Sequence, residues 1–185
     1  MKEQSKITAK DTLNFWFDKA HQKLWFAKDE NFDLQIKQRF EVVYQEALLE
    51  KTEFWRSSAQ GRLAEIILLD QFPRNMFRNT PKSFAADSIA LNRAQAAIES
   101  GDDLKLTTQE RAFIYMPFMH SEDKKIHARA VQLFSLKGLE ENLKFELLHK
   151  KIIDRFGRYP HRNQILSRKS TPEEIEFLKE AQSSF

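Results

Sequence analysis

Apolar residues recur at helical spacing along almost the whole chain. Between residues 29 and 51 they fall three or four positions apart, at Phe32, Ile36, Phe40, Val43 and Ala47. This spacing places them on one face of an α-helix. No run of alternating β-branched residues, which would indicate a strand, interrupts the pattern. The sequence therefore predicts an all-α protein.

The same pattern, with glycine and proline as breakers, divides the chain into helical segments. They are expected at about residues 8–17, 29–51, 63–72, 81–98, 109–119, 121–136, 140–156 and 172–181. Residues that can cap a helix stand at several of their starts, namely Thr8, Asp29 or Asn31, Thr80, Thr107 or Thr108, Ser121 and Thr171. No internal repeat or linker divides the chain, so we expect one domain over residues 1–185.

Two of these segments are apolar on every side, which is typical of helices at the centre of a domain. The first contains Ile66-Ile-Leu-Leu69 and is expected to end at Pro73. Four polar residues lie at its end: Asp70, Gln71, Arg74 and Asn75. Asp70 continues the buried stripe, and a buried carboxylate requires a cation or several hydrogen-bond donors.

The second apolar segment is Ala112–Met119. Pro117 is expected to kink or close it, because proline removes one backbone hydrogen bond. The polar residues His120, Ser121, Glu122 and Asp123 follow.

The third polar junction is Arg155-Phe-Gly-Arg-Tyr-Pro-His-Arg-Asn163, where a helix gives way to a turn. In the helix before it we expect a buried stripe formed by Phe145, Leu148, Ile152 and Phe156. Arg155 would then point inward as well. We therefore expect Asp70 to meet Arg155 or Arg162 near the centre of the domain, as a carboxylate–guanidinium pair.

The formal net charge of +3 is unevenly distributed. Residues 124–169 contain 12 Lys and Arg against 4 Asp and Glu, whereas the segments on both sides are net negative. Such a local field favours anionic partners, although solvated lysine faces on helices would give the same balance.

Cysteine is absent, which excludes disulfides, thiolate nucleophiles and cysteine metal ligands. The first ten residues lack the apolar run of a secretory signal, and no stretch approaches the ~20 apolar residues that cross a bilayer. We expect a soluble, cytoplasmic protein without membrane contact.

Five motifs resemble the bacterial family called domain of unknown function 924: Phe15-Trp-Phe17, Trp25-Phe26 with Lys28-Asp29, Leu68–Asn75, Tyr115–Glu122 and Arg155–Asn163. The likeness runs from about Leu13 to Phe177. It implies a tetratricopeptide-like array of roughly eight to ten helices and no settled activity. Glu65 departs from the family's apolar pattern and is expected to face a groove. The run Lys124-Lys-Ile-His127 is more basic than the acidic and polar stretch expected from the family, which argues against a ligand-binding role for His127.

Our leading interpretation is a pocket that binds a small anionic ligand bearing phosphate or carboxylate. Acid–base catalysis there would fall to His120 or His161, each of which follows a proline-bearing turn. The expected ligand-binding residues are Asp70, Gln71, Arg74, Asn75, Glu122, Arg155, Arg158, Arg162 and Asn163.

No cofactor and no metal are predicted. Asp123 and His127 stand four residues apart, but the chain has no HExxH motif, and such a pair is more often an exposed ion pair. Ser121 adjoins His120 without the strained turn of a nucleophilic serine.

Two other classes of function remain open. In one, the helical array is a scaffold that holds an acidic peptide or partner protein, and the polar junctions are purely structural. In the other, the basic segment binds RNA, which is the weaker idea because no helix-turn-helix, RRM or KH motif is present. The sequence decides neither whether the protein is an enzyme nor its oligomeric state.

Overall fold

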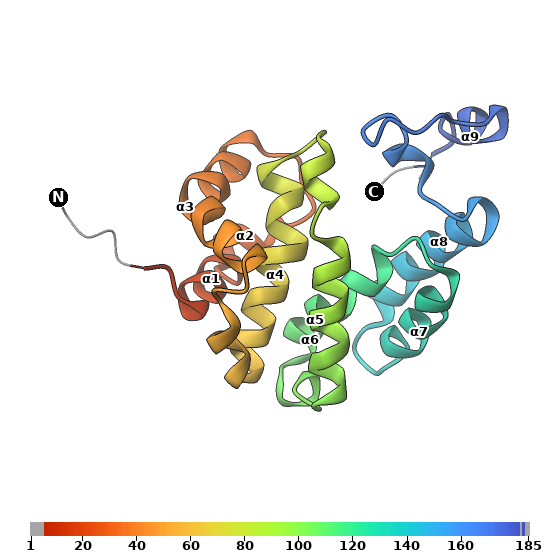
Figure 1. Ribbon diagram of the computed structural model, residues 1–185. Helices are drawn as coiled ribbons and strands as arrows, with labels where there is room; N and C mark the ends of the chain where they lie inside the picture. The colour runs from red at the N-terminus through yellow and green to blue at the C-terminus, as the bar shows by residue number, and fades with distance from the viewer. Residues whose placement is uncertain (1–5, 182, 184–185) are drawn as a thin grey trace.

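The computed structural model describes residues 6–181 and 183. Over this part the chain forms nine α-helices, four short 3-10 helices and no β-strand, so the predicted all-α class is confirmed (Figure 1). The α-helices are α1 (Ala9–Trp16), α2 (Lys19–Gln22), α3 (Glu30–Leu48), α4 (Ala59–Met76), α5 (Asp87–Glu99), α6 (Thr108–Met119), α7 (Lys124–Phe134), α8 (Glu140–Phe156) and α9 (Pro172–Phe177). The 3-10 helices are η1 (Glu53–Ser57), η2 (Pro81–Phe84), η3 (Asp103–Lys105) and η4 (Pro160–Arg162).

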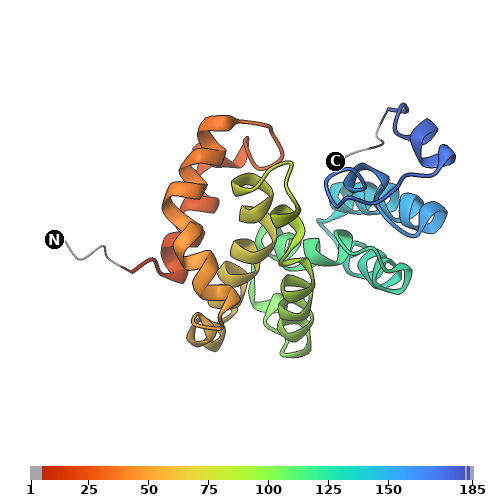
Figure 2. The same cartoon turned by 45° about the horizontal axis from the view of Figure 1, so that its top comes forward.

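Consecutive long helices pack against each other from α3 to α8. Figures 1 and 2 show the resulting array, with α1–α3 at one end and α8 and α9 at the other. This succession is compatible with a tetratricopeptide-like arrangement, which stays a prediction. No helix within the described residues is both long and apolar enough to cross a membrane.

The two segments predicted to be central are indeed buried. Every side chain from Leu63 to Pro73 in α4 and from Ala112 to Met119 in α6 is shielded from solvent. Helix α4 packs against α1, α3, α5 and α6. The core is rich in aromatic rings, and Trp25 lies edge-on to Phe113 with 4.7 Å between ring centroids. The polar ends of these helices are consequently held in fixed positions.

Most helices begin directly after a residue that the sequence predicted as a cap. Thr8, Thr107 and Thr171 each form a capping box with the acidic residue three positions later. Two expectations were wrong. The cap of α7 is Asp123 and not Ser121, and the helix expected over 81–98 is split into η2 and α5.

The two internal prolines do not end their helices. Pro73 lies within α4, which continues to Met76, and Pro117 lies within α6, which continues to Met119. Both prolines lie near the C-terminal end, where their fixed φ is already helical and only one backbone hydrogen bond is lost. The helical geometry therefore continues through both prolines, and the polar residues at the two helix ends keep the orientation that the helix gives them.

Helix α8 is rotated relative to the prediction. Its buried residues are Glu146, His149, Ile152 and Ile153, whereas Phe145 is 53% exposed. The cause is a polar pair, because Oε1 of Glu146 lies 2.7 Å from Nδ1 of the buried His127. This rotation turns Arg155 outward.

Candidate functional site

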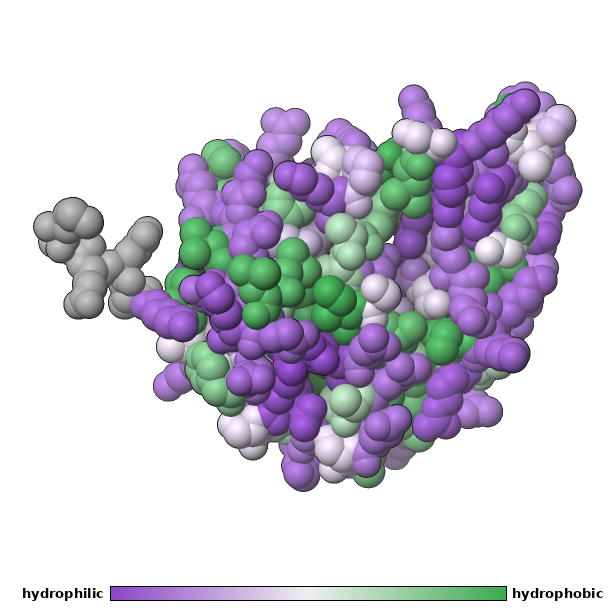
Figure 3. Space-filling view, in the orientation of Figure 1, coloured by the Kyte–Doolittle hydropathy of each residue, from purple (hydrophilic) through white to green (hydrophobic). Residues whose placement is uncertain are grey.

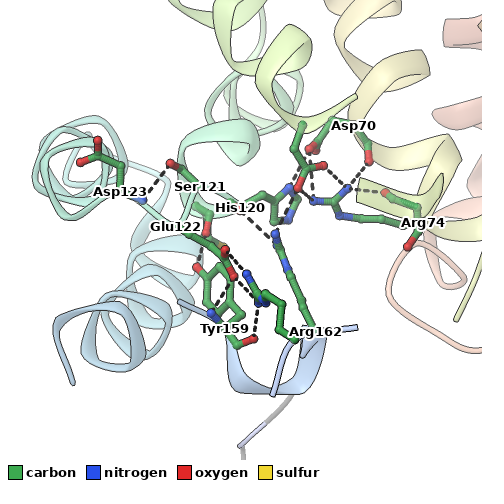
Figure 4. A network of polar contacts seen from close by, with 12 residues as sticks. Asp70, Arg74, His120, Ser121, Glu122, Asp123, Tyr159 and Arg162 are labelled. Atoms are coloured by element: carbon green, nitrogen blue, oxygen red, sulfur yellow. Dashed lines mark hydrogen bonds and ion pairs between the residues drawn. The ribbon is translucent and has the colours of Figure 1, made fainter. Parts of the chain in front are cut away.

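A buried carboxylate and a histidine form the centre of the candidate site (Figure 4). Asp70, on α4, is 0% exposed, and His120 follows the last residue of α6. Nδ1 of His120 donates to Oδ1 of Asp70 over 2.7 Å. Nε2 of Gln71 donates to the other carboxylate oxygen over 2.6 Å, and a guanidinium nitrogen of Arg74 lies 3.6 Å from Oδ1. The predicted grouping of Asp70, Gln71, Arg74 and His120 therefore exists.

The charges around Asp70 keep it ionised. Burial opposes its charged form, but the positive charge that His120 carries at acid pH and the charge of Arg74, with hydrogen bonds from His120 and Gln71, lower the pKa of Asp70 to about 2. Burial, followed by the positive charge of Arg74, lowers the pKa of His120 below its usual value. At neutral pH the pair is thus a carboxylate and a neutral imidazole.

The hydrogen bond fixes the tautomer of His120. An ionised carboxylate only accepts, so Nδ1 carries the proton and Nε2 keeps a lone pair. Nε2 has no hydrogen-bond partner within the described part of the chain, and the side chain is 16% exposed. Figure 3 shows the molecular surface hollowed between the η2–α5 region and the segment that follows α8. The arrangement is that of a positioned proton acceptor.

Two arginines from distant parts of the chain meet on one carboxylate beside this pair. Nη1 and Nη2 of Arg74 lie 2.9 and 3.3 Å from the two carboxylate oxygens of Asp87. Nη1 of Arg162 lies 3.2 Å from Oδ2 of the same residue. Nη2 of Arg162 donates to the backbone oxygen of His120 over 3.1 Å. Asp87 is the first residue of α5. Its carboxylate therefore links Arg74 on α4 to Arg162 on η4.

Arg162 is buried but only partly satisfied. It is 7% exposed, and its guanidinium lies 4.5 Å from the ring centroid of Phe84 and 4.6 Å from that of Tyr159. Its hydrogen bonds use one hydrogen on each terminal nitrogen, and its Nε is buried with no partner among the described residues. A guanidinium has five N–H donors, so Arg162 retains donor capacity.

The predicted convergence of the three polar junctions is therefore present, but the predicted pairing was wrong. Among the described residues, Asp70 forms no ion pair with Arg155 or Arg162. The partners of Asp70 are His120 and Arg74. The third junction reaches this group through Arg162, which pairs with Asp87, the partner of Arg74. Arg155 lies at the surface, where it pairs with Glu173 over 2.9 Å.

Glu122 supports the loop that carries Arg162. Its carboxylate accepts a hydrogen bond from the backbone N–H of Tyr159 over 2.8 Å. It also accepts from both terminal nitrogens of Arg168, over 2.6 and 2.9 Å. Figure 4 shows Glu122 directed at this loop. Its role is to fix the position of η4.

Several other predicted ligand-binding residues are satisfied by the protein itself. Arg158 binds Glu174 through two nitrogens, over 2.6 and 2.8 Å. The side-chain amide of Asn163 donates to the same carboxylate over 3.2 Å. The amide of Asn75 donates to Asp33 over 2.7 Å. These contacts hold helix ends together and leave no part of these groups directed at His120.

His161 differs from His120 in its surroundings. Burial, followed by the positive charge of Arg162, lowers the pKa of His161 to about 4. Its Nδ1 is buried without a partner, and no carboxylate within the described residues orients the ring. Of the two predicted catalytic histidines, only His120 has the geometry of an acid–base group.

The burial of Glu65 and His127 bears on two further expectations. Glu65 does not face a groove, since it is 0% exposed and accepts hydrogen bonds from Nε of Arg56 at 2.7 Å and from Thr52 at 2.8 Å. His127 is also buried, and its Nε2 lies 2.8 Å from the backbone oxygen of Ser121. No group of three or more possible metal ligands is gathered among the described residues.

Sequence reasoning missed Asp87, Phe84 and Arg168. Asp87 was assigned to the middle of one continuous helix, so nothing marked it as a helix start. Phe84 falls in the same expected helix, and nothing in the sequence around it indicates a contact with an arginine. Arg168 belonged to the basic segment that ends at residue 169, but its contact with Glu122 spans 46 positions. No local pattern reports contacts of that kind.

The fold and the site define an all-helical protein in which a buried Asp–His pair lies where three helix ends meet. The family profile described as "Bacterial protein of unknown function (DUF924)" matches residues 12–182. The chain belongs to this family, which confirms the resemblance seen in its motifs.

A solved structure, that of the protein of unknown function ATU0120 from Agrobacterium tumefaciens, is similar to this chain. The two share 41% sequence identity and superpose with a TM-score of 0.87. The match covers 92% of this chain and 96% of that one. No curated protein matches the chain.

Proposed function

We propose that the protein binds a small anionic molecule beside His120 and exchanges a proton with it through Nε2. The observation that carries this proposal is the bond of 2.7 Å between Nδ1 of His120 and a fully buried carboxylate. Such a carboxylate orients the ring, fixes the proton on one nitrogen and stabilises the imidazolium that forms when the other nitrogen accepts a proton.

Guanidinium donors that the protein leaves unused suit a ligand with a negatively charged, hydrogen-bond-accepting group. Arg162 has unused donors, and its guanidinium is held rigidly over two aromatic rings. Because Arg74 also lowers the pKa of His120, the imidazole is deprotonated and ready to accept a proton at neutral pH. A negatively charged ligand that binds together with a proton on Nε2 would use both features.

The test is a thermal-shift screen against organic acids and phosphorylated metabolites. We expect at least one compound to stabilise the wild type, and His120→Gln and Arg162→Gln to abolish that stabilisation. The matched control is His21→Gln, because Nδ1 of His21 also has a hydrogen bond, at 2.7 Å to the backbone oxygen of Phe15, but lies in another part of the fold. That variant should respond like the wild type.

A second measurement reports the tautomer directly. Long-range nitrogen–proton correlation spectra should show His120 protonated on Nδ1 and not on Nε2 at pH 7. The proposal fails if no compound in the screen stabilises the wild type, or if a compound that does so acts equally on His120→Gln.

A further inference from the structure

The charged side chains linked to His120 balance one another. They are Asp70 on α4, which pairs with Nδ1, Arg74 on α4 with its partner Asp87 at the start of α5, and Arg162 on η4, which donates to the backbone oxygen of His120. Two carboxylates face two guanidiniums, so the sum is zero while the imidazole is neutral. The neighbouring pair of Glu122 and Arg168 is neutral as well. Burial lowers the pKa of His149, on α8, to about 3 and keeps it uncharged.

Asp87 determines this balance. Without it, Arg74 and Arg162 would present two positive charges against the single carboxylate of Asp70. With it, both guanidiniums already have an anionic partner, at 2.9 and 3.2 Å. An incoming anion therefore adds a negative charge that the arginines no longer neutralise, and an unbalanced charge in a buried site is costly.

One group at the site can still gain a positive charge. It is Nε2 of His120, which has no hydrogen-bond partner among the described residues and can gain one charge only. His161, beside Arg162, stays neutral because burial lowers its pKa to about 4. The neutral site thus accommodates an anion of charge −1 if a proton arrives with it. A dianion would leave one charge uncompensated beside Asp70 and Asp87.

We infer that the ligand of this site is a small monocarboxylate, which binds together with one proton that comes to rest on Nε2 of His120. This inference rests on the proposed function and specifies its ligand class. The planar carboxylate suits the unused donors of Arg162, because a guanidinium presents parallel N–H groups to a planar anion. The proton comes from solvent, no covalent bond forms or breaks, and the site is neutral before and after binding.

Calorimetric titration of the wild-type protein tests the inference. The probes are lactate and butyrate as monoanions, with malonate and inorganic phosphate at pH 8 as dianions. Titrations in buffers of different ionisation enthalpy should show one proton taken up per monocarboxylate bound. The dissociation constant should rise about tenfold for each unit of pH over the range in which that full proton is taken up.

Asp87→Asn provides the decisive variant, because it adds one positive charge to the site at nearly constant shape. We expect it to bind phosphate at least about tenfold more tightly than the wild type does. The matched control is Asp33→Asn, since Asp33 has a side-chain exposure of 16% against 19% for Asp87 and also binds an arginine, Arg78. The control should leave phosphate binding unchanged. Thermal unfolding of both variants verifies that they are folded.

The outcomes separate the two proposals. Tighter binding of phosphate or malonate than of the monocarboxylates by the wild type, or monocarboxylate binding without proton uptake, would overturn the ligand class but not the proposed function. Unchanged phosphate binding by Asp87→Asn would overturn the charge balance on which the inference rests. Binding of none of these probes, together with an empty thermal-shift screen, would overturn both.

Discussion

Replacement of Asp70 by asparagine tests the physical basis of the site. Asparagine has nearly the same shape and retains an oxygen that can accept from Nδ1 of His120. It removes the negative charge that faces His120 and Arg74 in a fully buried position. The variant therefore isolates the contribution of charge from that of packing.

The magnitude follows from the pKa of Asp70, which falls from 3.8 to about 2 in the folded protein. Each unit of difference between the folded and unfolded pKa corresponds to about 1.4 kcal/mol, so ionised Asp70 stabilises the fold by about 2 kcal/mol at pH 7. Because the folded pKa is the lower one, this stabilisation is complete above the unfolded pKa and is lost as the pH falls. It should fall to about 1 kcal/mol at pH 3 and vanish near pH 1.

Urea denaturation of wild type and Asp70→Asn at pH 7 and pH 3 measures this dependence. The difference in unfolding free energy should be about 2 kcal/mol at pH 7 and roughly half of that at pH 3. As a control, Asp154→Asn removes a half-exposed carboxylate paired with Lys150 and should change stability by less than about 0.5 kcal/mol. A difference that is the same at both pH values would refute the assignment of a stabilising charge to Asp70.

Two further substitutions test the packing around the site. Glu65→Gln should lower the unfolding free energy by about 1–3 kcal/mol, because Arg56 keeps its exposed partner Glu50 but loses its buried carboxylate. Glu141→Gln, at an exposed ion pair, is the control, and equal effects of the two substitutions would contradict the argument. Gly61→Ala should cost about 2–3 kcal/mol in the same assay, since a Cβ there would lie 1.8 Å from the backbone oxygen of Trp55. Gly101→Ala, where nothing lies within 4 Å, should cost only about 1–2 kcal/mol, so a larger loss there would count against the steric explanation.

The parts of the fold that could be predicted from sequence are those set by local patterns. Helices α4 and α6 are apolar on all sides, so their central position followed directly from composition. The polar residues after those helices had to lie near the core for the same reason. The convergence of Asp70 and His120, 50 positions apart, was therefore within reach of the sequence.

The rotation of α8 was beyond local reasoning. An apolar stripe that contains Phe145 predicts one buried face, but the helix buries Glu146 and His149 instead. Polar residues are buried where a partner satisfies them, and the partner of Glu146 lies on another helix, at His127. The orientation of Arg155 depended on that long-range pair. The link between Asp87 and Arg162, across 75 positions, was hidden for the same reason.

Satisfaction of hydrogen bonds distinguishes His120 from Arg158 and Asn163. Arg158 and Asn163 are surrounded by partners that complete them, so their polar groups are accounted for by the fold. His120 is different, because the protein orients one ring nitrogen with a buried carboxylate, while the other has no partner among the residues that the structure describes. A purely structural histidine would gain from a second bond, as His127 does through its two nitrogens. The ring of His120 therefore makes one hydrogen bond fewer than it could within the protein. In the proposed function, the ligand interacts with this second nitrogen.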